Sequence, residues 1–535
     1  MKERNYIFRG WLLALLVTLG LFGVSFIPTV EVFGLKLERV DLLSDLRDNT
    51  AEEPVEYEAD IAHLEEVLAE MELTREVVAD TLPELPSVRY QWLVSQQPSL
   101  EHTALRSEVI LPDTTLRVVP IEDFDTIGQS RFDRLVEKLA NGEPVRIAFM
   151  GDSFVEGDIL TSDLRNELQE LFGGRGVGFV PCDIPFATVR RTVKRRSTGW
   201  SSYSVMKPKA APEHLRDIFF VSGYLSEGGV GATTRWQTIG ELSRLDSCTE
   251  ARVLLLARDS SRVELTLKDT LRHEVALAGD ERLREISVEG EIASLAVKVL
   301  EGKVVCYGAS LEGDGGVTLD NFSVRSNNGH AIFGTGAAIN RQADDMLGYD
   351  LVVLQYGLNI MLPNQRNFSK YRDQLRDMIA YVERCFPEAA ILVLGVSDRW
   401  IKDDQSGRYK PIGSVDALTR HQRAAADSCN VAFWNTSAAM AELGGMPAFV
   451  ANGWAAGDYT HINYGGGRRV AKALAAALRE PVGRILYERE EMERLRQERL
   501  RISLEHQTLV EERIGGVSFD MDTTVTTLTA SDDRP

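Results

Sequence analysis

The sequence predicts an α/β fold, with a parallel sheet covered by helices on both faces and interrupted by an inserted all-β region. Three short apolar runs suited to buried strands, at 145–150, 351–355 and 390–396, alternate with amphipathic helical patterns. Such alternation is typical of parallel sheets covered on both faces. Between residues 205 and 312 the helical patterns stop, and strand-like runs recur about every ten residues. This spacing is typical of a β-sandwich.

The N-terminus begins with a candidate membrane segment. Residues 11–30 contain no charged side chain, and Lys2, Arg4 and Arg9 precede them. About 20 apolar residues span a bilayer as a helix, and the positive-inside rule keeps residues 1–10 in the cytoplasm. The alternative is a cleaved signal peptide, which normally has a shorter apolar core and a small-residue cleavage site. We expect an uncleaved, single-pass signal anchor in the inner membrane, with the bulk of the chain in the periplasm or cell exterior.

The charge of the chain is concentrated after this segment. The chain has 60 Lys+Arg and 80 Asp+Glu, a net charge of −20. Residues 31–84 alone hold 17 acidic and 4 basic residues, so we expect 31–118 to be an acidic membrane-proximal stalk or linker. A general nucleic-acid binder would present a basic surface instead, and we expect no nucleic-acid partner.

The five cysteines are scattered and form no CxxC pattern, which argues against a disulfide scaffold and against a zinc site. Cys248 and Cys306 are either a disulfide pair or two unpaired core cysteines. The second interpretation is favoured, because cysteine is commonly buried.

These patterns divide the rest of the chain. We expect the first part of the α/β domain at 119–204, the inserted β-sandwich at 205–312 and the second part at 313–483. A charge-dense helix follows at 484–514, with heptad-like apolar spacing at Leu495, Ile502 and Leu509 that is too short to indicate a coiled coil. The Thr-rich residues 515–535 are expected to be a disordered tail.

The strand-like run 145–150 leads directly into Gly151-Asp152-Ser153. A serine at the carboxyl end of a parallel strand lies at the edge where α/β sheets bind ligands, and the amides of a following helix can stabilise an oxyanion there. A serine nucleophile needs an imidazole base that a carboxylate orients. Asp458 and His461 could supply both groups from one loop before the last core helix. The residues by themselves favour the alternative, in which Gly151-Asp152-Ser153 is an ordinary turn and His461 a solvent-facing loop residue.

Four segments of the chain resemble, in order, the four sequence blocks of the SGNH (GDSL-like) hydrolases. Each falls after a core strand or before the last helix, as in that family. The segments are Gly151-Asp152-Ser153, Gly329 in Ser326-Asn327-Asn328-Gly329, Gly357-Leu358-Asn359, and Asp458-x-x-His461. The G-x-S-x-G elbow of the α/β-hydrolases is absent, because residue 155 is valine.

This resemblance implies a flavodoxin-like three-layer α/β/α hydrolase domain. It also implies that Ser153 is the nucleophile, that His461 is the base and that Asp458 orients it. The Ser153 amide, the Gly329 amide and the Asn359 side chain would form the oxyanion hole. The resemblance implies no metal and no organic cofactor.

A narrower resemblance concerns segments 151–158 and 174–181, which are similar to the start of the peptidoglycan O-acetylesterases. Those enzymes also carry a β-sandwich, carbohydrate-module-like insert between the first and second blocks. The chain departs from them at Phe154, where they often have His, and at Ile360, where they have an acidic residue.

The narrower resemblance implies a serine esterase that removes O-acetyl groups from a cell-envelope polysaccharide, in the first place peptidoglycan. The predicted anchor, which lies outside this resemblance, makes it an exported, membrane-anchored enzyme. The same residues suit a polysaccharide O-acetyltransferase that works beside a membrane acetyl exporter or membrane acetyltransferase partner. A non-catalytic glycan-binding scaffold is the alternative of another class. In each case the expected partners are an acetylated cell-wall or surface polysaccharide and the membrane.

Two further features are candidates for glycan binding. Two tryptophans, Trp200 and Trp454, either stack on sugar rings or pack in the core. A cluster of five cations either holds an anionic glycan near the rim of the active site or carries solvated charges on an exposed segment. The cations are Arg190, Arg191, Lys194, Arg195 and Arg196.

Overall fold

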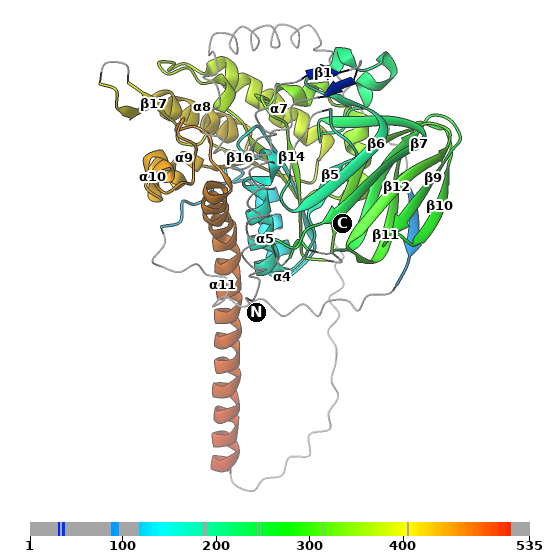
Figure 1. Ribbon diagram of the computed structural model, residues 1–535. Coiled ribbons are helices and arrows are strands. Elements are labelled where there is room, and N and C mark those ends of the chain that lie inside the picture. Colours follow the sequence, from blue (N-terminus) through cyan, green and yellow to red (C-terminus); the bar gives the residue numbers. More distant parts are fainter. Residues whose placement is uncertain are drawn as a thin grey trace, which may run out of the picture. The chain divides into compact units, whose positions relative to one another are not determined.

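The computed structural model describes residues 30–32, 35–37, 87–95, 117–185, 190–242, 244–246, 248–313, 315–403 and 406–514 (Figure 1). The predicted anchor at 11–30, apart from Val30, lies outside the described residues, as do most of the predicted stalk and the whole of the predicted tail at 515–535. Within the described residues, no helix is both long enough and apolar enough to cross a membrane. Strands β1 (Val30–Val32) and β2 (Leu35–Leu37) pair with each other in a separate antiparallel sheet.

A five-stranded parallel sheet forms the centre of the α/β domain. Its strand order is β14-β4-β15-β16-β19, which in chain order is 2-1-3-4-5, the flavodoxin-like arrangement. The predicted fold class is therefore confirmed at this level. The strands are β4 (Val145–Gly151), β14 (Val317–Ser323), β15 (Leu351–Gln355), β16 (Ala390–Leu394) and β19 (Ala432–Trp434). Every residue of β4, β15 and β16 is buried, which explains why these strands are apolar except for Arg146 on β4 and Gln355 at the end of β15.

Two groups of helices pack on this sheet. Helix α11 contacts both α4 and α5, and α7 contacts both α6 and α8. The helices are α4 (Arg131–Asn141), α5 (Thr161–Phe172), α6 (Ala337–Leu347), α7 (Ser369–Cys385), α8 (Ser414–Ser428), α9 (Thr436–Glu442), α10 (Gly445–Ala451) and α11 (Tyr464–Ile514). Short 3-10 turns are η1 (Glu156–Asp158), η2 (Pro208–Ala210), η3 (Glu213–Ile218), η4 (His330–Gly334) and η5 (Leu358–Ile360), and a small hairpin joins β17 (Trp400–Lys402) to β18 (Tyr409–Pro411).

Local sequence explains the ends of these helices. Ser130 caps α4 by accepting from the amide of Asp133, whose own side chain accepts from the Ser130 amide. Gly142 ends the helix in the left-handed region, at φ 69°. The sequence predicted separate helices for the end of the core and for 484–514, whereas α11 runs through both and through Pro481 as one helix.

The inserted region is one continuous ten-stranded sheet (Figure 1). Strand β13 pairs with β8 along one side and with both β7 and β5 along the other, and buried apolar side chains of the insert form a core cluster. Its strands are β3 (Val88–Leu93), β5 (Gly178–Pro181), β6 (Val193–Ser204), β7 (Tyr224–Thr238), β8 (Cys248–Ala257), β9 (Ser261–Leu267), β10 (Leu271–Leu277), β11 (Leu283–Ile292), β12 (Ser294–Glu301) and β13 (Val304–Glu312).

This sheet begins earlier in the chain than the predicted boundary at residue 205. Strand β3, from the predicted linker, pairs in parallel with β11, and β5 and β6 come from the predicted first part of the hydrolase domain. Strand β6 was missed because its exposed positions include Lys194 and Arg196, so the strand has the appearance of a charged loop. All five cysteines are free and four of them, including Cys248 and Cys306, are buried, which confirms the favoured interpretation.

A buried arginine joins the two sheets. Arg146 on β4 donates from Nε to Asp320 Oδ2 on β14 at 2.9 Å and from Nη2 to Ser310 Oγ on β13 at 2.7 Å. Its Nη1 donates to the carboxylate of Glu312, also on β13. The side chains of Arg146, Glu312 and Asp320 are at most 7% exposed. The parallel sheet and the insert are therefore joined by a buried network of charges.

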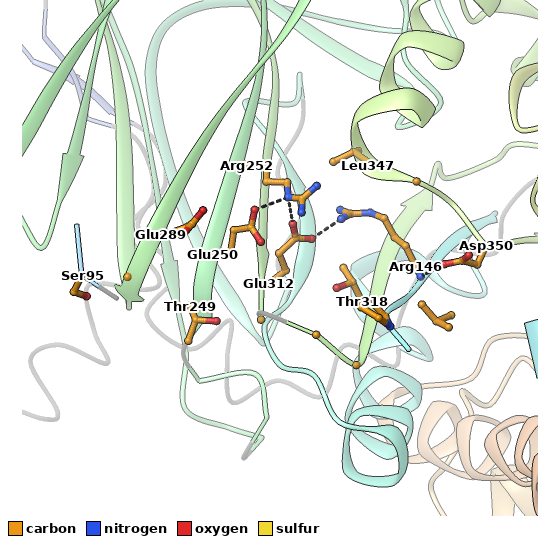
Figure 2. Close-up of a pocket in the computed structure, with 17 residues that line it drawn as sticks. Ser95, Arg146, Thr249, Glu250, Arg252, Glu289, Glu312, Thr318, Leu347 and Asp350 are labelled. Carbon is orange, nitrogen blue, oxygen red and sulfur yellow. Dashed lines mark hydrogen bonds and ion pairs between the residues drawn. The ribbon is translucent and has the colours of Figure 1, made fainter. Parts of the chain in front are cut away.

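A cavity of about 410 Å³ lies beside this network (Figure 2). Arg252 lines it and donates to Glu250 at 2.8 Å, and its Nε lies 2.5 Å from Glu312 Oε1. The cavity is also lined by Val145 and Gly316, at the amino ends of β4 and β14. Ser153 follows the opposite end of β4, so this cavity is not where the predicted chemistry takes place.

We predict that Arg146→Met lowers the free energy of unfolding by about 3–5 kcal/mol, because it leaves the buried Asp320 and Glu312 carboxylates without their shared cation. Urea denaturation of the full chain measures the change. Arg262→Met is the matched control. Arg262 lies 3.0 Å from Glu274 in a pair whose side chains are 42% and 50% exposed, so its loss costs about 1 kcal/mol or less. Equal losses in the two variants would show that the Arg146 network does not join the sheets.

Candidate active site

Three of the predicted blocks leave adjacent strands at the same edge of the parallel sheet. Gly151 at the end of β4 is paired with Ser323 on β14 and with Gln355 on β15. Ser153, Gly329 and Asn359 follow these paired residues in sequence. Because parallel strands end at a common edge, the three blocks are carried to the same place.

A chain of hydrogen bonds connects the three blocks. Asp152 Oδ1 accepts from the amide of Phe154 at 2.9 Å, and Asp152 Oδ2 accepts from Asn359 Nδ2 at 3.4 Å. Asn359 Nδ2 also donates to the carbonyl of Asn327 at 3.0 Å. Asn327 Oδ1 in turn accepts from the Gly329 amide at 2.9 Å. The structure therefore brings the first three blocks together.

The predicted oxyanion donors are in different states. The Ser153 amide makes no hydrogen bond with any described residue, whereas the Gly329 amide and the Asn359 side chain both donate to Asn327. Both would have to release Asn327 in order to bind an oxyanion. Glycine is required at 329, where φ is 97° and a Cβ would lie 2.5 Å from Met378 Sδ.

The start of α11, which follows the fourth block in sequence, contacts the turn that follows Ser153. A bridge between Ala455 and Ile462 closes the loop that carries Asp458 and His461, both of which are exposed. Just beyond the loop, Tyr464 Oη donates to the carbonyl of Gly157 at 2.8 Å. The first turn of α11 packs closely on the same segment, since a Cβ on Gly467 would lie 1.8 Å from the Ile159 carbonyl oxygen.

His461 interacts electrostatically with Asp152, the residue that precedes the predicted nucleophile. The Ser153 hydroxyl itself, which is half-buried, makes no hydrogen bond within the described part of the chain. A hydrogen bond between Ser153 and His461 is therefore not formed in this structure. Catalytic hydrogen bonds often tighten only when substrate is bound.

Asp152 is fully buried. Burial raises the pKa of its carboxyl from 3.8 to about 7, although the Phe154 amide and the charge of His461 oppose the shift. The carboxyl therefore changes charge near neutral pH, in contact with Asn359 and in the field of the predicted base.

Asp158, which the sequence analysis did not assign to the site, holds the turn after Ser153 in place. It is fully buried with φ 67°, and its carboxylate accepts from Arg190 Nε at 2.8 Å and from Asn321 Nδ2 at 2.9 Å. Asn321 also donates to the carbonyl of Val155 at 3.0 Å. The only signal for Asp158 in the sequence was its place in the segment 151–158.

The electrostatics of this cluster depend on two arginines. Burial by itself raises the pKa of Asp158, but the nearby charges of Arg190 and Arg165 hold it well below its ordinary value. Two hydroxyls add support, from Thr161 at 2.8 Å and from Thr192 at 3.0 Å. Asp158 therefore remains ionised and links α5, β14 and the insert to the nucleophile turn.

The predicted cation cluster is divided by the structure. Arg190 donates to Asp158 and to the carbonyls of Phe179 and Val177, and Arg191 binds the Asp163 carboxylate. Their donors are used within the protein, which favours a structural role over the expected glycan contact and also over solvated charges. The other three cations lie on β6, with Lys194 and Arg196 exposed and Arg195 half-buried.

The two candidate tryptophans pack within the protein. Trp200 packs against the core of the insert, and a Cβ on Gly228 of β7 would lie 2.4 Å from its ring. Trp454 lies edge-to-face with Phe449, and the Arg469 guanidinium lies 4.4 Å from its ring centroid. Both rings are partly buried, so the structure favours packing over sugar stacking.

Comparison with known proteins supports the fold. No family model and no curated protein sequence matches the chain. A solved structure of a peptidoglycan O-acetylesterase is similar with a TM-score of 0.56 and 22% identity, over 68% of this chain and 99% of that one. A family two carbohydrate esterase from Cellvibrio japonicus (TM-score 0.19, 9% identity, 46% of this chain and 88% of that one) and an acetyl xylan esterase (TM-score 0.22, 19% identity, 30% and 79%) are much less similar. The first comparison confirms the predicted SGNH-type resemblance at the level of the fold.

We predict that Asp152→Asn changes how stability depends on pH. Between about pH 4 and pH 7 the folded chain keeps a proton on Asp152 that the unfolded chain has lost. The contribution of Asp152 to the free energy of unfolding is therefore present at low pH. It falls by about 1.4 kcal/mol per pH unit as pH rises towards 7. Asparagine has no such proton, so the variant gains stability relative to the natural chain over this interval and no further above it. Denaturant unfolding at a series of pH values measures the difference, and parallel profiles would contradict the prediction.

Proposed function

We propose that the chain is a serine esterase that removes O-acetyl groups from a polysaccharide. The observation that carries the proposal is the meeting of Ser153, Gly329 and Asn359 at one sheet edge, joined by hydrogen bonds through Asp152 and Asn327. The hydrogen bond from Tyr464, three residues after His461, to the nucleophile turn supports it. A glycan-binding scaffold would not need this set of groups.

In the proposed mechanism Ser153 Oγ attacks the acetyl carbonyl while His461 accepts its proton. Asp458 orients the imidazole and stabilises its charged form. The tetrahedral oxyanion is held by the free Ser153 amide, joined by Gly329 and Asn359 once they release Asn327. His461 then returns the proton to the departing sugar oxygen, and water activated by the same imidazole hydrolyses the acetyl-enzyme.

The finer parts of the proposal concern substrate and place. We propose peptidoglycan as the polysaccharide and an inner-membrane location with the catalytic domain in the periplasm or cell exterior. Support comes from the uncharged segment 11–30, from the acidic residues 31–84 and from the fold shared with a peptidoglycan O-acetylesterase. Transfer of the acetyl group to a sugar hydroxyl would use the same acyl-enzyme, and an anchor would hold the site near a membrane donor.

We predict that Ser153→Ala and His461→Ala each lower acetate release from an aryl acetate and from O-acetylated peptidoglycan by about 10³-fold or more, because the nucleophile and its base act as a unit. Ser503→Ala and His506→Ala, on the exposed part of α11, are the matched controls and keep full activity.

Activity that survives in both Ser153→Ala and His461→Ala would refute the esterase. If labelled acetyl from the aryl acetate appears on a glycan acceptor faster than as free acetate, the transferase is the correct assignment.

A further inference from the structure

Arg325 lies just after the end of β14, the strand that pairs with the one preceding the predicted nucleophile. Ser323 at the end of β14 is paired with Gly151 at the end of β4. Arg325 and Ser153 each follow these paired residues by two positions, on strands that lie about 4.8 Å apart. Both residues therefore lie just beyond the carboxyl ends of adjacent strands, at the same edge of the sheet.

The guanidinium of Arg325 binds one carboxylate through Nε, and its other two nitrogens have no partner among the described residues. Its Nε lies 2.6 Å from Glu156 Oε2, in the turn that follows Ser153. The side chain of Glu156 is only 10% exposed, whereas that of Arg325 is 71% exposed. The Nη1 and Nη2 groups make no hydrogen bond with any residue that the structure describes. A planar guanidinium with both Nη groups open presents a fork that matches the two oxygens of a carboxylate.

We infer that Arg325 forms a carboxylate-binding subsite next to Ser153. The ligand is a free carboxylate on the acetylated sugar or on its neighbour in the polymer. Two kinds of glycan carry such a group, a uronic acid residue and a sugar with a lactyl ether. The inference rests on the proposed function and narrows its substrate to acidic O-acetylated polysaccharides.

Glu156 explains why the subsite is preorganised. An exposed arginine loses rotamer entropy when it binds, and the hydrogen bond to the buried Glu156 reduces that loss. The same bond uses Nε alone, which leaves the end of the fork for substrate. Lysine at position 325 would keep the charge but lose the fork, which separates recognition of a carboxylate from a general effect of charge.

The test compares carboxylated and uncharged substrates in the full chain. Arg325→Gln and Arg325→Lys are assayed with an aryl acetate, with an O-acetylated uronan and with O-acetylated glycan strands that carry free lactyl groups. Each polymer is also assayed after its carboxylates have been converted to amides. Arg272→Gln, which removes an exposed arginine on β10, is the control.

We expect Arg325→Gln to raise the KM for a carboxylated polymer about 10- to 100-fold, at least tenfold more than its effect on the aryl acetate. Arg325→Lys should fall between the natural chain and Arg325→Gln. Amidation should abolish the difference between Arg325→Gln and the natural chain. The polymer with the larger loss identifies the source of the carboxylate. Equal losses on polymer and aryl acetate, or a KM that amidation leaves unaltered, would overturn the inference.

A binding measurement separates this inference from the proposed function. Calorimetric titration of the two polymers into Ser153→Ala needs no turnover. Adding Arg325→Gln to that variant should weaken binding by the same 10- to 100-fold. Unaltered binding overturns the subsite whatever the esterase assays show, and weakened binding without esterase activity refutes only the esterase.

Discussion

The buried carboxylate of Asp158 is the constraint on which the candidate site depends. It accepts hydrogen bonds from α5, from β14 and from the insert, and it does so from a backbone with positive φ. A carboxylate without partners in this position would be very costly, so the surrounding elements can pack only when all of its donors are present. The turn that presents Ser153 takes its shape from that requirement, and Asn321 extends the same network to the turn's backbone.

A second buried cluster, around Arg146, meets the first on β14. Asp320, which accepts from Arg146, and Asn321, which donates to Asp158, are adjacent residues of that strand. The insert contributes to both clusters, through Glu312 to the cluster around Arg146 and through Arg190 to the cluster around Asp158. It is thus attached to the α/β domain by two buried groups of charges.

The predicted oxyanion donors of the candidate site have hydrogen-bond partners in the structure even though no ligand is bound. Without an oxyanion, the Gly329 amide donates to the side chain of Asn327 and the Asn359 side chain donates to its carbonyl. Neither donor is therefore left without a hydrogen-bond partner. The Ser153 amide is the donor that stays open. An oxyanion bound there would accept a new hydrogen bond from the Ser153 amide and would replace Asn327 as the acceptor for the other two donors.

The sequence by itself determined the elements whose signal is local. Continuous apolar runs identified β4, β15 and β16, because strands buried on both faces carry no polar alternation. The position of Ser153 at the end of β4 followed from the same pattern. Only the tertiary structure decided which partners these elements meet. Arg190 and Asp158 are 32 residues apart and Asn321 and Asp158 are 163 apart, and periodicity shows which face of an element is buried but not what lies against it. For that reason the sequence did not show that part of the cation cluster binds carboxylates within the protein. It also did not show that the linker supplies an edge strand, or that Arg325 lies near Ser153 because β14 pairs with β4.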